Sequence, residues 1–271
     1  MKAREALTKA AERLRMVGAT PRFDAELLMA HALGTSREEL ILSRLDDEAP
    51  ASFEAMVARR ERSEPVAYII GRRGFWTIDL EIGQGALIPR PDTETLIEAA
   101  VSHFAEKGPR TVLDLGTGPG TLLLAALDQW PQARGLGIDI SEAALAYARR
   151  NAERLGLADR ALFQCGDWAE GIEGPFDLIL CNPPYVDEQA TLMPDVVEWE
   201  PEEALFAAEQ GLAEYRRLAE AIPQLLGDGL ACVEIGLGQG EQVSAMFEAA
   251  GLRVSGRRDL AGHLRCLVLS H

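Results

Sequence analysis

Four consecutive residues near the middle of the chain, Asn182-Pro183-Pro184-Tyr185, have the clearest chemical potential in the sequence. They follow an apolar run, residues 176–181, that predicts a buried strand. The two prolines fix φ and have no N–H, so carbonyl acceptors are held beside a flat ring. Such a site suits a planar amide or an exocyclic amine. The tetrapeptide alone is also compatible with a rigid turn or a polyproline segment.

A second group of residues could hold an adenosine-bearing ligand. A predicted strand runs into Gly116-Thr117-Gly118-Pro119-Gly120 before a predicted helix, and closely spaced glycines let the backbone approach a ligand at a helix N-terminus. A dinucleotide dehydrogenase remains an alternative, although its pattern, G-x-G-x-x-G, has the third glycine one residue later. Asp139 lies 23 residues after Gly116, where a carboxylate can accept both hydrogen bonds of a ribose diol. After the next strand, Asp167 and Trp168 could hold an adenine amine and ring face.

Composition narrows the function classes. The chain has 271 residues and is 47% hydrophobic, which favours two domains. Lys and Arg total 27 against 43 Asp and Glu, and a net charge of −16 disfavours direct binding to nucleic acid. A local cluster is an exception to this acidity, and we interpret it as a solvated helix face and linker. It consists of Arg59, Arg60, Arg62, Arg72 and Arg73.

Nothing near Met1 resembles a secretory signal, and no apolar stretch approaches the roughly 20 residues that span a bilayer. The four cysteines form no C-x-x-C pair and lie in apolar, strand-like surroundings, so we interpret them as reduced core residues of a cytoplasmic protein. The four histidines lack metal-ligand spacing, and no metal is predicted.

The hydrophobic periodicity changes along the chain. Residues 1–62 have repeated helical periodicity, and residues 66–88 contain an alternating run between glycines that predicts a β-hairpin. From residue 111 onward, strands alternate with helices, which predicts a doubly wound parallel sheet. Residues 252–256 and 264–269 have no room for a helix between them, so we expect an antiparallel pair at one sheet edge. The predicted domains are residues 1–72 (helical), 73–90 (hairpin linker) and 91–271.

The combined motifs resemble class I S-adenosylmethionine-dependent methyltransferases, and within them the protein-glutamine N(5)-methyltransferases that modify peptide chain release factors. The resemblance covers nearly the whole chain, with small departures at Pro119, Cys181 and Leu264. Besides the two motifs above, the segments that carry it are Asp24-Ala25-Glu26-Leu27-Leu28, Glu64-Pro65-Val66-Ala67-Tyr68-Ile69-Ile70-Gly71, Leu87-Ile88-Pro89-Arg90-Pro91-Asp92-Thr93-Glu94, Glu200-Pro201, Ala204-Leu205-Phe206 and Asp259-Leu260-Ala261-Gly262-His263.

The resemblance implies a seven-stranded Rossmann-like sheet with an antiparallel last strand, and S-adenosyl-L-methionine as cofactor. It implies methylation of the glutamine side-chain nitrogen in the Gly-Gly-Gln loop of release factors, a step linked to translation termination. Gly116 to Gly120, Asp139, Trp168 and Asn182 would bind the cofactor. The segment Asn182-Pro183-Pro184-Tyr185 would bind the substrate, with Asn182, Pro183 and Tyr185 as the catalytic residues.

The helical domain would dock the protein substrate, and nothing in the sequence demands more than a monomer. Alternative acceptors are a glutamine of a ribosomal protein and, less favoured, adenine in DNA. A non-enzymatic cofactor-binding module is a third alternative, which the intact motifs disfavour. Arg90 and Glu94 invite catalytic interpretations, but Pro91, Asp92 and Glu94 also form an ordinary helix start, which we favour.

Overall fold

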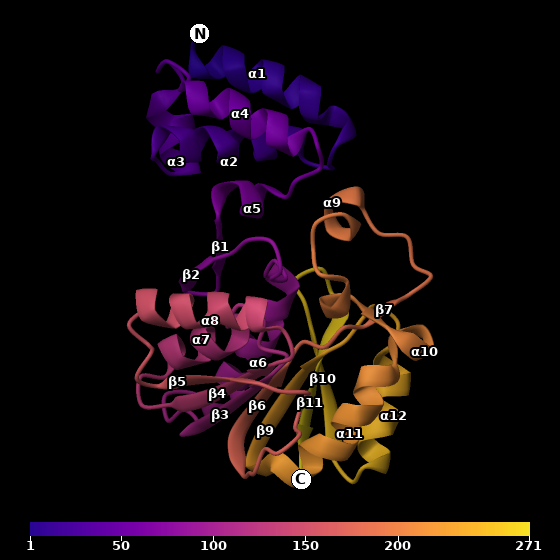
Figure 1. Ribbon diagram of the computed structural model, residues 1–271. Coiled ribbons are helices and arrows are strands. Elements are labelled where there is room, and N and C mark those ends of the chain that lie inside the picture. Colours follow the sequence, from indigo (N-terminus) through magenta and orange to yellow (C-terminus); the bar gives the residue numbers. More distant parts are fainter. The chain divides into compact units, whose positions relative to one another are not determined.

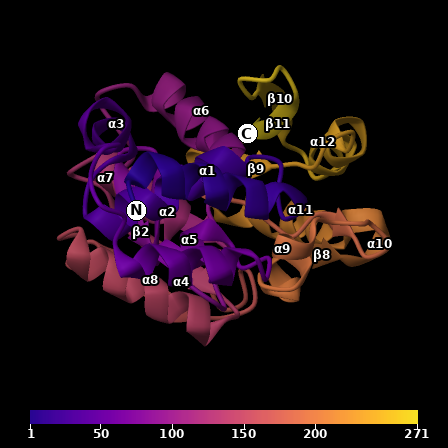
Figure 2. The same ribbon diagram turned by 90° about the horizontal axis from the view of Figure 1, so that it is seen from above.

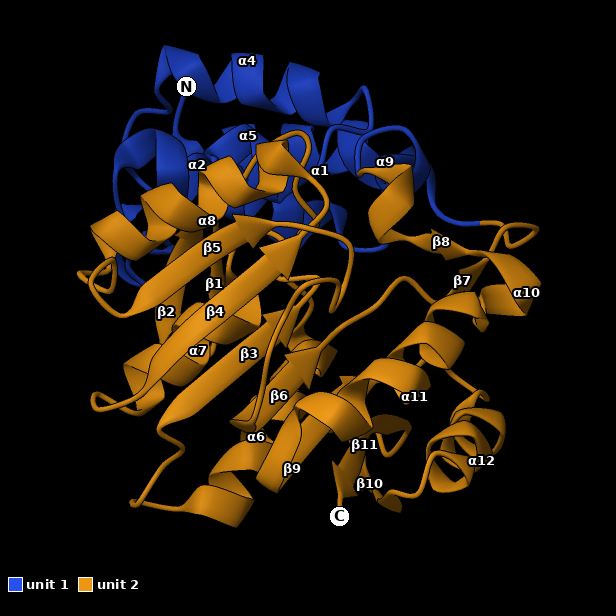
Figure 3. Ribbon diagram, turned by 60° about the horizontal axis from the view of Figure 1, so that its bottom comes forward, with its two compact units in different colours: residues 1–72, 192–200 blue, residues 73–191, 201–271 orange.

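The computed structural model describes residues 1–271, which divide into two compact units. Unit 1 contains residues 1–72 and 192–200, and unit 2 contains residues 73–191 and 201–271 (Figure 3). This division differs from the predicted one, because the hairpin belongs to unit 2 and residues 192–200 belong to unit 1. The second difference has a clear physical basis. Arg60 donates a hydrogen bond to Asp195 at 3.1 Å across 135 residues of sequence, a contact that no local pattern reveals.

Unit 1 is helical, as its periodicity predicted (Figure 1). Pro21 begins its second helix, and Gly34 ends it with φ of 67°, a left-handed conformation that glycine adopts without steric cost. Leu7, Leu14 and Leu28 are fully buried in its core. The elements are α1 (Ala3–Arg13), η1 (Leu14–Met16), α2 (Pro21–Leu33), α3 (Arg37–Glu39), η2 (Leu40–Arg44), α4 (Ala51–Arg60), α5 (Val66–Ile70) and α9 (Pro194–Val197).

The predicted hairpin is present but shorter than the alternating sequence suggests. Strands β1 (Arg72–Phe75) and β2 (Ile78–Glu81) pair as a two-stranded sheet, and residues 66–70 form a helix instead of joining it. The chain turns at Trp76, whose φ is 52°. Glu94 accepts a hydrogen bond from the Trp76 N–H at 2.9 Å, so a distant carboxylate holds the turn inside the run.

The main sheet of unit 2 has seven strands in the order β10-β11-β9-β6-β3-β4-β5. Strand β11 runs antiparallel to both neighbours, and the other pairings are parallel. This confirms the predicted doubly wound sheet with an antiparallel pair at its edge. The strands are β3 (Thr111–Leu115), β4 (Arg134–Asp139), β5 (Ala161–Cys165), β6 (Phe176–Cys181), β9 (Leu226–Glu234), β10 (Arg253–Arg258) and β11 (Leu264–Ser270).

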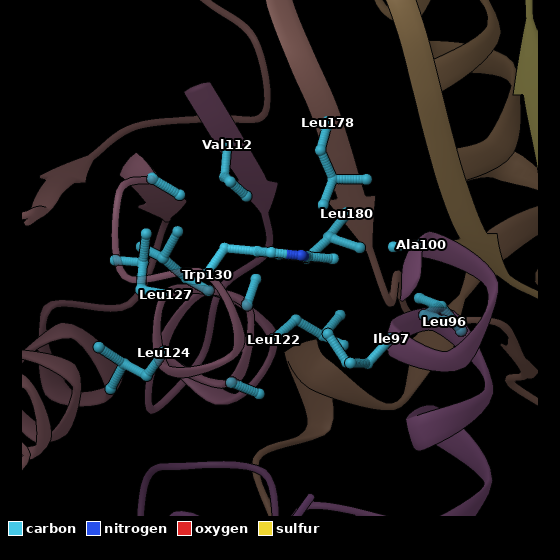
Figure 4. Close-up of a cluster of buried hydrophobic side chains, with 14 of the residues drawn as sticks. Leu96, Ile97, Ala100, Val112, Leu122, Leu124, Leu127, Trp130, Leu178 and Leu180 are labelled. Atoms are coloured by element: carbon cyan, nitrogen blue, oxygen red, sulfur yellow. The ribbon is translucent and has the colours of Figure 1, made fainter. Parts of the chain in front are cut away.

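Helices cover both faces of this sheet, with α6 and α7 on one side and α11 and α12 on the other (Figures 1 and 2). Successive strand residues alternate between the two cores: Leu178 and Leu180 pack with α6 and α7, and Ile179 packs with α11. Figure 4 shows the first core around Trp130. The remaining elements are η3 (Pro91–Thr93), α6 (Glu94–Phe104), α7 (Thr121–Gln129), α8 (Glu142–Arg154), β7 (Val186–Asp187), η4 (Glu202–Ala204), β8 (Phe206–Ala207), α10 (Ala208–Gly211), α11 (Ala213–Leu225) and α12 (Gly240–Ala249).

The cysteines follow the predicted pattern in part. Cys181, Cys232 and Cys266 are buried, and all four thiols are free. Cys165 is exposed at the end of the edge strand β5, so its prediction as a core residue was wrong. An edge strand has a neighbour on one side only, which leaves its last residue open to solvent. None of the helices has the length and apolar character needed to cross a membrane.

Candidate active site

A cavity of about 260 Å³ lies in unit 2 where strands β3, β4 and β6 end. Open parallel sheets bind ligands at this carboxyl edge. The walls come from the loops after these strands, from Gly166 to Trp168, from residues 85–93 and from residues 201–206. The motifs predicted to bind a nucleoside and an amide therefore face one cavity.

The glycine loop bends sharply at the start of α7. Gly116, Gly118 and Gly120 have φ of 72°, 56° and 87°, in the left-handed region where other residues are strained. A Cβ at Gly116 would lie 3.2 Å from the Trp168 ring, so a side chain there would close the space between loop and indole. Asp114 anchors the loop, because its Oδ2 accepts hydrogen bonds from the Thr117 hydroxyl at 2.6 Å and the Leu123 N–H at 3.0 Å. Complete burial raises the pKa of Asp114 to about 7.

Asp139 ends β4 with its carboxylate in the cavity wall. One oxygen accepts the Gly118 N–H at 2.7 Å, and the other accepts the Ser141 N–H at 2.9 Å. Burial raises the pKa of Asp139, and these two backbone hydrogen bonds partly oppose that rise. A carboxylate offers about four acceptor positions. Each oxygen therefore keeps a position for a ligand hydroxyl.

The Trp168 ring lies beside Gly116 of the glycine loop. The backbone of Trp168 has a φ of 50°. Its indole N–H donates to Glu214 of α11 at 2.5 Å, which fixes the plane of the ring. Arg217 binds both Asp167, at 2.6 Å, and Glu214, at 3.2 Å. The acidic side chain predicted to hold an adenine amine, Asp167, is thus engaged by a guanidinium, although it still lines the cavity.

Asn182 follows the last residue of β6 and reaches the cavity from the side opposite Asp139 in sheet order. Its Nδ2 donates to the Thr93 hydroxyl at 3.3 Å, which leaves Oδ1 free to accept a hydrogen bond. Pro184 also lines the cavity, whereas Pro183 is buried and Tyr185 lies behind the wall. The Tyr185 hydroxyl donates to Glu234 at 3.0 Å.

Glu234 was missed by sequence reasoning. It is the last residue of β9 and is 1% exposed. Burial raises its pKa to about 7, while the nearby Thr93 hydroxyl, the Tyr185 hydrogen bond and the charge of Arg265 oppose the rise. Its Oε2 is buried near Thr93 and has no partner in hydrogen-bond geometry. A signal was present, because burying an acid inside the apolar run 230–235 is costly unless a neighbour forms a hydrogen bond or an ion pair with it.

The structure brings most, but not all, of the predicted residues to the cavity. Those lining it are Gly116, Thr117, Gly118, Pro119, Asp139, Trp168, Asn182 and Pro184. Gly120, Pro183 and Tyr185 lie outside the lining. Arg90 and Thr93 do line it, so the helix-start interpretation of that segment is incomplete for Arg90. Glu94 holds the hairpin turn instead.

Comparison with known proteins agrees with a methyltransferase domain that follows a helical N-terminal domain. Residues 5–71 match the family model described as PrmC N-terminal domain, and residues 107–220 match one described as Methyltransferase domain. A release factor glutamine methyltransferase of Rhodospirillum rubrum is 47% identical over 97% of this chain and 83% of its own length. One of Caulobacter vibrioides is 42% identical over 97% and 94%.

Solved structures support the fold alone. A methyltransferase from Pyrococcus furiosus superposes with a TM-score of 0.55 at 17% identity, covering 81% of this chain and 98% of the other. A ribosomal protein L11 methylase from Lactobacillus delbrueckii subsp. bulgaricus gives 0.52 at 22% identity, covering 70% and 83%. Both similarities agree with the seven-stranded sheet.

Proposed function

Because the chain belongs to the release factor glutamine methyltransferase family, we propose that it transfers a methyl group from S-adenosylmethionine to a glutamine side-chain nitrogen of a release factor. The acceptor on this proposal is the glutamine of the factor's Gly-Gly-Gln loop. One observation carries it in this chain: Asn182 presents a free amide oxygen to the same cavity that the glycine loop and Asp139 line.

The residues present fit the cofactor. The position of a side chain at Gly118 is open space, and at Gly116 only the absence of a Cβ keeps a gap to the Trp168 ring, which suits a methionine chain lying against the backbone. Asp139 keeps two acceptor positions for the ribose hydroxyls, and the fixed Trp168 ring offers a flat wall for adenine. When bound, S-adenosylmethionine supplies an electrophilic methyl carbon on a sulfonium.

The protein residues then have to orient a poor nucleophile. The lone pair of a glutamine amide nitrogen is delocalised into its carbonyl, so the nitrogen reacts only if it is aimed. We propose that Asn182 Oδ1 and the Pro183 carbonyl each accept one amide N–H. Two acceptors fix the plane of the substrate amide and direct its nitrogen toward the methyl group. Orientation of this kind reaches effective molarities of about 10⁵ M or more, so no strong base is required.

Tyr185 is a catalytic residue by resemblance, and its contacts suggest how it would act. Its hydroxyl is bound to Glu234 and its ring lies outside the cavity lining. We therefore propose that Tyr185 holds the Pro183-Pro184 backbone in place. Proton loss follows methyl transfer, when the methylated nitrogen is acidic.

We propose that unit 1 binds the body of the release factor. It exposes large apolar side chains: Met16 is 95% exposed and Leu42 is 84% exposed. Two arginines of the local basic cluster are engaged within unit 1 instead. Arg59 pairs with Glu64, and Arg60 is buried between Asp24 and Asp195.

Replacement of Met16 and Leu42 together by serine tests this role. Because the cavity is untouched, affinity for S-adenosylhomocysteine should stay within about threefold, while KM for the intact factor should rise roughly tenfold or more. A double variant with the KM of the wild type would remove the docking role from these side chains.

Labelled methyl transfer tests the proposed reaction. The protein is incubated with tritiated S-adenosylmethionine and, in separate reactions, a release factor, ribosomal particles or DNA. Label in the factor alone supports the proposal, whereas label in ribosomal protein or DNA, with none in the factor, replaces it. The cytoplasmic location and the monomeric state stay predictions.

A further inference from the structure

Behind the cavity, three elements meet around one buried carboxylate. Glu234 at the end of β9 accepts the Tyr185 hydroxyl at 3.0 Å through Oε1, and its Oε2 is buried near the hydroxyl of Thr93 in η3 without a hydrogen-bond partner. Thr93 is 3% exposed and in turn accepts the Asn182 Nδ2 hydrogen bond at 3.3 Å. Thr93 therefore lies between Glu234, which does not line the cavity, and Asn182, which we place at the reacting nitrogen.

We propose that Glu234 is a positioning residue, which fixes through Thr93 the rotation of the Asn182 amide and holds Tyr185 in place. The inference rests on the function proposed above and adds residues to that same site.

The argument follows from donor and acceptor capacity. An ionised carboxylate only accepts hydrogen bonds, and a threonine hydroxyl has a single hydrogen to donate. If Thr93 donates toward Glu234, its oxygen can only accept from Asn182. The Asn182 amide must then turn Nδ2 toward Thr93 and Oδ1 toward the substrate. The substrate amide needs an acceptor at that point.

Loss of the negative charge on Glu234 would remove this preference for one orientation of the Asn182 amide. A glutamine or a protonated acid at position 234 can itself donate to Thr93, and the Thr93 hydroxyl could then rotate to donate to Asn182 Oδ1. Asn182 would present N–H groups to the N–H groups of the substrate. Such a pair repels and misplaces the nitrogen, and a misplacement of about 1 Å can cost roughly 100-fold in rate.

The charges around Glu234 decide when it is ionised. Arg265 is the nearby cation and also pairs with Asp92 at 3.2 Å and with Asp259 at 3.5 Å. The Tyr215 hydroxyl donates to the Glu234 backbone carbonyl at 3.1 Å. The remaining titratable neighbours are Cys181, Tyr185, Cys266 and Asp92, all neutral or acidic. Because burial moves the pKa of Glu234 to about 7, the ionised form should be lost as the pH falls through that range.

Three substitutions test the inference: Thr93→Val, Thr93→Ser and Glu234→Gln. A fourth, Thr95→Val, is a matched control, since Thr95 is a buried threonine in α6 that does not line the cavity. Each protein is assayed for transfer to the release factor as a function of pH and for binding of S-adenosylhomocysteine by calorimetry. Binding and a cooperative melt show that each variant is folded.

We expect Thr93→Val to lower kcat by roughly 30–100-fold with cofactor affinity changed less than about threefold, and Thr93→Ser to restore most turnover. Thr95→Val should match the wild type. In Glu234→Gln, kcat should fall roughly tenfold or more above neutral pH, and the decline of the wild-type rate below about pH 7 should be reduced.

Two results would overturn the inference without touching the proposed function. One is a wild-type kcat in Thr93→Val, and the other is a wild-type kcat and pH profile in Glu234→Gln, each with the unsubstituted enzyme active on the factor. An unsubstituted enzyme that fails to methylate the factor would instead refute the proposed function, and this inference with it.

Discussion

Substitution of Asp139 by alanine should weaken cofactor binding strongly. Two of the four acceptor positions of this carboxylate are filled by Gly118 and Ser141, which leaves two for the ribose hydroxyls. A hydrogen bond to a charged group contributes about 1.5 kcal/mol or more, so losing both should cost about 3 kcal/mol. Since 1.4 kcal/mol is tenfold in Kd, affinity should fall roughly 100-fold.

Calorimetric titration with S-adenosylhomocysteine near pH 8 measures this change, since burial raises the pKa of Asp139 and a higher pH favours its ionised form. Asp139→Asn retains one acceptor oxygen and loses the charge, so it should fall between the wild type and Asp139→Ala. Glu142→Ala is the control: Glu142 begins α8 nearby, pairs with Arg149 and does not line the cavity. Affinity of a folded Asp139→Ala within about threefold of the wild type would refute the assignment of the ribose to this side chain.

Three further substitutions test other parts of the account. Asn182→Ala should lower kcat by roughly 100-fold or more with little change in cofactor affinity, and near-normal turnover would rule out the orientation mechanism. Glu234→Gln should change the pH dependence of stability: the folded pKa of Glu234 is raised, so its contribution is present below the unfolded value of 4.5 and is lost as the pH rises through about 7. The variant should therefore gain up to about 3 kcal/mol on the wild type between pH 5 and 8 in denaturant melts, and parallel curves would contradict the shifted pKa. Arg60→Met should lower the free energy of unfolding by about 3 kcal/mol, because Asp24 would be left buried and Asp195 half-buried without a counter-charge, and an unchanged denaturation midpoint would show that this ion pair does not stabilise unit 1.

Local patterns in the sequence were sufficient for much of the sheet. The strand over residues 176–181 has the predicted bounds, because it is a short apolar run with turn residues on both sides. The glycine loop and Asp139 were placed correctly relative to the strands for the same reason. Both follow directly from where a strand ends, and strand ends at one edge of a parallel sheet meet in space.

Features that depend on distant contacts were not predicted. The alternation through residues 75–82 predicted a hairpin but not the position of its turn, which Glu94 holds at Trp76 from 18 residues away. Residues 192–200 join unit 1 through the Arg60 hydrogen bond to Asp195, which leaves no periodic trace in the sequence.

The proximity of Thr93 to Glu234 was not predicted, for the same reason. Thr93 and Glu234 lie 141 residues apart in sequence and meet only after the sheet has formed. Their residue types are ordinary, since a threonine before a helix and an acid at a strand end have many structural explanations. Only the geometry connects them to Asn182.

Mass spectrometry of the modified release factor tests the central claim most directly. The factor is incubated with S-adenosylmethionine and either the wild-type protein or Asn182→Ala, digested, and its peptides are fragmented to locate the added group. The account predicts one methyl group on the side chain of the glutamine in the Gly-Gly-Gln loop with the wild type, and almost none with Asn182→Ala. A methyl group on another residue, or an unmodified loop after incubation with active wild-type protein, would contradict it.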